Sequence, residues 1–105
     1  DNEYVEPLIQ EVYHEIDRLH QEPVSAKELT IVRNYMLGEM CRSYESPFSL
    51  SDAWIFIATS GLDDDYFSRS LLAVNEVTPM EIQDLAQRYL CKETLKEVIA
   101  GKKLS

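Results

Sequence analysis

The stretch Val24–Met40, VSAKELTIVRNYMLGEM, carries the start of a long predicted helix. It follows Pro23 and opens with Ser25 and Glu28 at the spacing of a capping box, in which the serine hydroxyl accepts a backbone N–H of the first turn and the glutamate side chain reaches back. Apolar residues then recur at the helical period, so the stretch predicts a long helix that runs to about Tyr44. The residues expected to face inward are Leu29, Val32, Met36, Met40 and Cys41.

The segments on either side of this stretch also predict helices. Residues 4–21 carry apolar side chains in steps of three and four, and Pro23 stops that helix. Ser46 and Pro47 start another helix, because serine is a good cap and proline suits the first helical position. Gly61 is a fitting end for it, since glycine readily adopts the left-handed conformation that closes a helix.

Two more helices are predicted in the second half of the chain. Asp63-Asp64-Asp65 opens the first of them, because carboxylates favour the positive end of the helix dipole. Thr78 and Glu81 have the spacing of a second capping box. The apolar face of the helix that follows this box is formed by Ile82, Leu85, Ala86, Tyr89 and Leu90.

The last predicted element is a strand over residues 94–101, where Val98 and Ile99 favour extended backbone. A single strand cannot satisfy its own backbone groups, and no second convincing strand is present. The predicted fold class is therefore mainly α, with about five helices plus one C-terminal strand, which is an incomplete α+β domain. Residues 1–105 suit a single domain, and a chain that begins at Asp1 is expected to be a fragment of a larger protein.

The charge and the cysteines limit the possible partners and the location. A net charge of −9 repels phosphate backbones and anionic lipid, so neither nucleic acid nor a membrane is a predicted partner. The longest apolar run, residues 53–58, is too short to span a bilayer. Cys41 and Cys91 are interpreted as small core hydrophobes. Without a disulfide framework or a recognisable signal peptide, we expect a cytoplasmic or periplasmic location.

The segment His14–Glu22, HEIDRLHQE, holds both histidines and invites a test for zinc. A zinc-binding helix needs two imidazoles one turn apart beside a glutamate, as in H-E-x-x-H or H-x-x-E-H. Arg18 stands where the forward motif needs histidine, and Leu19 stands where the inverse motif needs glutamate. His14 and His20 are six residues apart, so they point about 120° away from each other on one helix. We interpret the segment as a solvated helix face.

Other local patterns for catalysis or metal binding are also incomplete. Asp63-Asp64-Asp65 lacks the alternating ligands, central glycine and closing glutamate of a calcium loop. The serines form no G-x-S-x-G elbow, and the three glycines form no phosphate-binding loop. The sequence therefore predicts no catalytic residue, no metal ligand and no cofactor for this chain, and it leaves the substrate-binding residues unknown.

Two segments carry a resemblance to a known family. In Val24–Met40 the pattern is a helix start followed by a basic residue, carried by Val24, Ser25, Glu28, Leu29 and Arg33. In Val77–Leu90 it is a second helix start, carried by Val77, Thr78, Glu81, Ile82, Leu85, Ala86, Arg88, Tyr89 and Leu90. Together with the closing Val98–Gly101, and in this order, these segments resemble the end of a repeat in the pitrilysin/insulinase family of zinc metallopeptidases, which includes processing-peptidase-like proteins.

The resemblance implies that the chain is the C-terminal part of a non-catalytic repeat, with its helical layer and final strand. The family's zinc motif, H-x-x-E-H, lies in another repeat, so zinc is expected in the catalytic domain of the parent protein. No functional residue of the family matches a position of this chain. The implied function is a non-catalytic segment that helps to enclose a peptide substrate. The implied partners are the remainder of the parent chain and, within the parent, the peptide.

Two alternatives to this function stay open. The parent could be a structural or partner subunit of the processing-peptidase or respiratory-core type, without peptidase activity. The chain could also be a free-standing acidic helical interaction module. One prediction concerns the isolated chain: helices that lack their sheet expose an apolar face, so we expect self-association, with a homodimer in which the predicted strand could pair across a two-fold axis.

Overall fold

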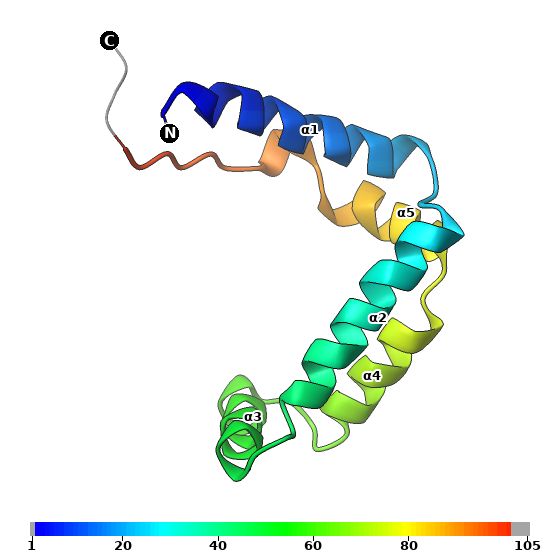
Figure 1. Cartoon of the computed structure of the whole chain (residues 1–105), viewed down its shortest axis with the longest axis vertical. Coiled ribbons are helices and arrows are strands. Elements are labelled where there is room, and N and C mark those ends of the chain that lie inside the picture. Colours follow the sequence, from blue (N-terminus) through cyan, green and yellow to red (C-terminus); the bar gives the residue numbers. More distant parts are fainter. Residues whose placement is uncertain (1, 102–105) are drawn as a thin grey trace. The chain divides into compact units, whose positions relative to one another are not determined.

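The computed structural model describes residues 2–101, and these residues are mainly helical (Figure 1). The order of elements is η1 (Asn2–Tyr4), α1 (Val5–Gln21), α2 (Ala26–Arg42), α3 (Pro47–Ser60), α4 (Tyr66–Glu76), α5 (Pro79–Tyr89) and η2 (Lys92–Thr94). The predicted mainly α class with five helices is therefore confirmed. The described residues divide into two compact units, of which one joins residues 2–24 to residues 79–101 and the other spans Ser25–Thr78.

The helix starts predicted at Ser25 and Ser46 and the helix end predicted at Gly61 are present. Ser25 accepts a hydrogen bond from the backbone N–H of Glu28 (3.1 Å), and the Glu28 carboxylate accepts one from the Ser25 N–H (3.2 Å), so the capping box is complete. Ser46 caps α3, and Pro47 occupies its first turn. Gly61 closes α3 with φ 66° and ψ 30°, a conformation that other residues rarely adopt.

The predicted C-terminal strand is not observed among residues 2–101. Lys92–Thr94 forms a short 3-10 helix instead. Leu95 has extended dihedral angles, and residues 95–100 continue without regular secondary structure beside α1 (Figure 1). The physical reason is that the backbone groups of a strand form hydrogen bonds with an adjacent strand. The described part of the chain supplies no second strand for such a ladder.

Two predictions about buried side chains are wrong. Cys41 is exposed and Cys91 is only half-buried, so neither is a core residue. On α2, the predicted inward stripe is buried only at Leu29, while Val32 and Met36 are exposed. The complete set of buried apolar side chains among the described residues is Ile16, Leu29, Ala53, Ile57 and Ala86.

In the unit that contains both ends of the described chain, α1 packs against α5. Ile16 of α1 and Ala86 of α5 are its buried apolar residues. Polar groups fasten the same pair of helices. A ring nitrogen of His20 lies 2.8 Å from the Ala86 carbonyl oxygen, and the side-chain amides of Gln83 and Gln87 both donate to the carbonyl oxygen of His20 (3.0 and 2.8 Å).

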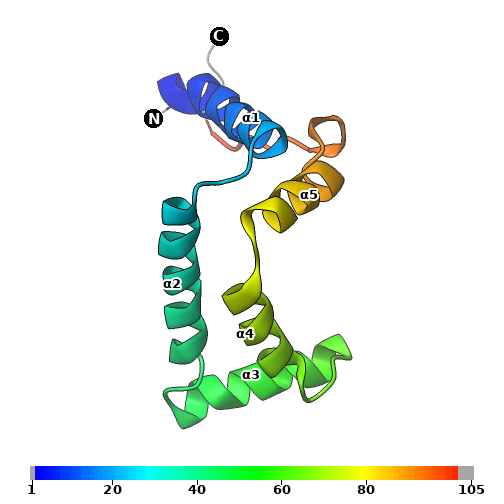
Figure 2. The same ribbon diagram turned by 90° about the vertical axis from the view of Figure 1, so that its right-hand side faces the viewer.

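In the Ser25–Thr78 unit, α2 packs beside α4, and α3 lies across their ends (Figure 2). Ala53 and Ile57 form the buried side of α3. Aromatic rings also pack between the end of α2 and α4, where Tyr44 meets Phe67 edge to face with ring centroids 5.2 Å apart. Each unit therefore has a thin apolar core, which leaves most of the large apolar side chains on the surface.

Candidate functional site

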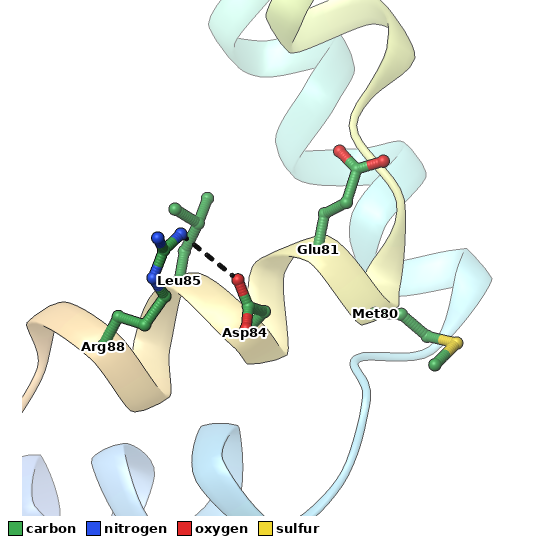
Figure 3. A pocket seen from close by; sticks show the side chains of 5 residues that line it. All are labelled: Met80, Glu81, Asp84, Leu85 and Arg88. Atoms are coloured by element: carbon green, nitrogen blue, oxygen red, sulfur yellow. Dashed lines mark hydrogen bonds and ion pairs between the residues drawn. The ribbon is translucent and has the colours of Figure 1, made fainter.

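The surface of α5 carries the hollow drawn in Figure 3. It has a volume of about 430 Å³ and is lined by Met80, Glu81, Asp84, Leu85 and Arg88. Arg88 and Asp84 face each other one helical turn apart and form an ion pair with an N–O distance of 3.4 Å. The Arg88 guanidinium also lies 5.8 Å from the centre of the Tyr89 ring. The hollow is lined by two apolar side chains, Met80 and Leu85, and by three charged ones, of which Arg88 and Asp84 are paired with each other.

A second hollow of about 340 Å³ adjoins the first, since Leu85 lines both. Its lining contains no charged side chain and consists of Leu19, Ile82, Leu85, Ala86, Tyr89 and Leu90. The predicted apolar face of this helix is therefore present, but Ala86 is its only buried residue. The arrangement suits apolar docking of another polypeptide, because it offers contact area without a nucleophile or a base.

The Ser25–Thr78 unit has a hollow of its own, of about 430 Å³, between α2 and α4. Four apolar or weakly polar side chains and two polar ones line it, namely Leu37, Cys41, Leu71, Leu72, Ser68 and Asn75. No imidazole or carboxylate is among these residues, so the Cys41 thiol and the Ser68 hydroxyl have no general base beside them there. The exposed thiol is best read as part of an apolar surface.

The two histidines and the aspartates do not assemble into a metal centre. His14 is exposed, whereas His20 is occupied by the carbonyl of Ala86. Asp65 stands at the N-cap position of α4 without capping it, and it pairs instead with Arg69 (3.1 Å). Within residues 2–101, no group of three or more His, Cys, Asp or Glu side chains is placed to hold a metal ion. None of the helices in this range is long and apolar enough to cross a bilayer.

A polar cluster holds η2 and the segment after it on α1. Lys92 forms an ion pair with Asp17, and its ammonium group lies 5.8 Å from the centre of the Tyr13 ring. The Tyr13 hydroxyl donates a hydrogen bond to the Glu97 carboxylate. This bond, followed by desolvation and the negative charge of Glu97, raises the pKa of Tyr13 above its ordinary value of 10.0. These contacts join residues far apart in sequence, so local patterns could not predict them.

This cluster gives a pH-dependent prediction. Because the pKa of Tyr13 is raised in the folded chain, the contact with Glu97 is complete below the ordinary tyrosine pKa and is lost as pH rises through the raised value. In an ultraviolet difference titration, Glu97→Gln should lower the pKa of Tyr13. Glu93→Gln, close by on the same segment, is the matched control and should leave the pKa of Tyr13 unchanged. Equal titration curves for Glu97→Gln and the parent sequence would contradict the contact.

One feature that sequence reasoning missed is the role of Arg33. Its Nε donates to the carbonyl oxygen of Val74 (3.1 Å), and its Nη2 donates to that of Val77. These carbonyls lie at the C-terminal end of α4, where helix carbonyls lack intrahelical partners and the dipole favours a cation. The sequence feature that could have predicted this role is the position of an arginine within the apolar stripe of α2. The contact makes Arg33 a structural residue of this unit.

Comparison of the chain with protein-family models, with curated proteins and with solved structures found no match.

Proposed function

We propose that this chain is a non-catalytic helical layer of a larger zinc-peptidase-like protein. In that protein it packs against a β-sheet contributed by the rest of the parent and helps to enclose the peptide substrate. Zinc and the catalytic residues belong to another part of the parent. The segment 95–100, extended but unpaired in this chain, becomes a strand when it joins the edge of that sheet.

The observation that carries this proposal is the amount of surface left exposed. The chain has an accessible surface of 8556 Å². A compact folded monomer of 12.1 kDa exposes roughly 6,000 Å², and two separate compact units of half that mass would expose roughly 7,200 Å² together. Large apolar side chains are exposed on each of the helices α1 to α5 and contribute to this surface. Such a surface is expected of a layer that covers something else.

The ordered motifs support the choice of parent. The two helix starts, at Ser25 and Pro79, open α2 and α5, which are the helices that carry the family resemblance. A resemblance in sequence order and an unfinished core point to the same kind of protein, namely a helical layer separated from its sheet. The resemblance to non-catalytic repeats of this family implies that the chain helps to enclose a peptide.

The test starts from the coding DNA upstream of Asp1. An in-frame H-x-x-E-H motif with a distant glutamate supports the peptidase, and a long upstream frame without these ligands supports a structural or partner subunit. The complete protein is then produced with and without residues 1–105, and cleavage of a quenched fluorescent peptide is measured. We expect the intact protein to cleave it and the shortened protein to lose at least tenfold in kcat/KM, since the peptide is no longer enclosed.

Hydrogen exchange provides a readout that does not depend on activity. The amides of residues 95–100 should exchange rapidly in the isolated chain and become protected in the complete protein, because ladder hydrogen bonds form there. A start codon directly before Asp1, or rapid exchange of these amides in the complete protein, would contradict the proposal.

A further inference from the structure

The side chains of the segment that follows η2 alternate between two sides. Val98 is 91% exposed, whereas Ile99 is 61% and Leu95 is 38% exposed. Glu97 has the same place in this alternation as the two less exposed residues, and its carboxylate accepts a hydrogen bond from Tyr13 of α1. Extended backbone turns successive side chains to opposite sides. The side that carries Leu95, Glu97 and Ile99 therefore faces α1, and the side that carries Val98 faces away from it.

The polar cluster fixes the direction of this segment along α1. Lys92, at the start of η2, pairs with Asp17, and Glu97 is bonded to Tyr13, one helical turn earlier on α1. As the chain advances from Lys92 to Glu97, it therefore passes α1 from Asp17 toward Tyr13. The segment runs antiparallel to α1, as the ribbon shows (Figure 1).

These two attachments also predict which residue of α1 the next apolar side chain meets. Extended backbone advances about 3.3 Å per residue and a helix about 1.5 Å, so two residues of the segment match about four residues of α1. Ile99 is two residues beyond Glu97, which places it level with Ile9, four residues before Tyr13. Ile9 is half-buried, and its spacing puts it on the same side of α1 as Tyr13.

The backbone of the segment is left open to an adjacent strand. The N–H of Leu95 donates to the carbonyl oxygen of Lys92 (3.3 Å), whereas residues 96–100 take part in none of the backbone hydrogen bonds of the described residues. A row of unpaired N–H and C=O groups along extended backbone is a template for strand pairing. Side chains thus attach the segment to α1, while its backbone groups stay available.

The attachment acts against the charge of α1. This helix has one arginine and four acidic residues, namely Glu6, Glu11, Glu15 and Asp17. Such a helix repels the carboxylate of Glu97. The ammonium group of Lys92 pairs with Asp17 and lies 5.8 Å from the centre of the Tyr13 ring, so it lowers the negative charge at the point where Glu97 approaches.

We propose that the polar cluster of Tyr13, Asp17, Lys92 and Glu97 holds residues 95–100 on α1 as a preformed strand, with its face and direction fixed before a partner strand binds. This inference rests on the proposed function, in which the segment joins a sheet of the parent. An ordered strand loses less conformational entropy when it pairs. A shift of one residue would turn every side chain to the other face, so the cluster also selects the register.

The proposal is tested by nuclear magnetic resonance on the whole chain. We expect backbone order parameters of about 0.85 for residues 96–99, the value of a rigid backbone. Nuclear Overhauser contacts should join the methyl groups of Ile99 to Ile9, and none should join Val98 to α1. This order is compatible with rapid amide exchange in the isolated chain, because side chains attach the segment and its amides have no acceptor.

Two variants remove the attachments one at a time. Tyr13→Phe removes the hydroxyl that donates to Glu97 and keeps the ring, and Asp17→Asn removes the charge that pairs with Lys92. Each should lower the order parameters of residues 96–99 to below about 0.6, the range of flexible backbone, while the circular dichroism stays helical. Tyr89→Phe is the matched control, because it removes an exposed hydroxyl on α5 outside the cluster and should change nothing in the segment.

Three outcomes would overturn the preformed strand. They are order parameters below about 0.6 in the parent sequence, contacts of α1 with Val98 in place of Ile99, and equal order in the parent sequence and both variants. All three are measured on the isolated chain and leave the proposed function untouched. Rapid amide exchange of the segment in the complete protein would instead contradict the proposed function, so the two failures are distinguished.

Discussion

Replacing Ile57 with alanine unfolds the Ser25–Thr78 unit of the isolated chain. Ile57 is the most buried apolar side chain described, with 3% of its surface exposed. Removing three carbons from such a site costs about 2–5 kcal/mol, the sum of lost transfer free energy and the cavity left behind. A core this small rarely supplies more than about 3–5 kcal/mol in total. The substitution therefore removes most or all of the stability of the unit.

The measurement is urea unfolding followed by Trp54 fluorescence, which reports α3 in the same unit. Ile31→Ala is the matched control, because the same atoms are removed from a side chain that is 61% exposed on α2. Its effect should stay within about half a kcal/mol, as for most surface substitutions. A loss of less than 1 kcal/mol for Ile57→Ala would mean that Ile57 does not carry the core of this unit.

The part of the fold that could be predicted is the part that local chemistry determines. Ser25 with Glu28, Ser46 with Pro47, and Gly61 place the ends of α2 and α3 through hydrogen bonds and dihedral preferences within one turn. Such signals act over a few residues, so the sequence alone contains all the information they need.

The parts that could not be predicted depend on neighbours distant in the chain. Helical periodicity shows which face of α2 is apolar, but it does not show whether another element covers that face. Met36 and Cys41 consequently lie on the surface although they follow the apolar pattern. The strand predicted after Thr94 has the right residues, yet no strand forms among the described residues, because a ladder needs a partner.

The same limit applies to the candidate site. The sequence predicted an apolar face on α5, but the hollow there also needs Leu19 of α1. The ion pair of Lys92 with Asp17 and the contact of the His20 ring with the Ala86 carbonyl oxygen likewise join residues more than sixty positions apart. The absence of a catalytic residue from this chain, which the sequence predicts, stays a prediction.

Replacing Arg33 with methionine should cost the Ser25–Thr78 unit about 2–3 kcal/mol. The substitution keeps much of the apolar stem and removes the donors to the carbonyl oxygens of Val74 and Val77. A hydrogen bond from a charged group contributes about 1.5–3 kcal/mol, and an acceptor left without its donor in a half-buried position adds to the loss. In hydrogen exchange, the amides of the last turn of α4 should lose protection before the rest of the helix.

Arg33→Lys separates the two reasons why the guanidinium stabilises this end of α4. Lysine keeps the positive charge near the negative end of the helix dipole, but its single ammonium group cannot reproduce the geometry of two guanidinium donors. We expect a loss of about half that of Arg33→Met, whereas Asn34→Ala on the neighbouring exposed position should have little effect. A lysine variant as stable as the parent sequence would mean that the charge suffices, and one as unstable as the methionine variant would mean that the two hydrogen bonds carry the whole contribution. If neither Arg33 variant differs from Asn34→Ala, the contact between α2 and the end of α4 contributes nothing to stability, and apolar packing alone holds these helices together.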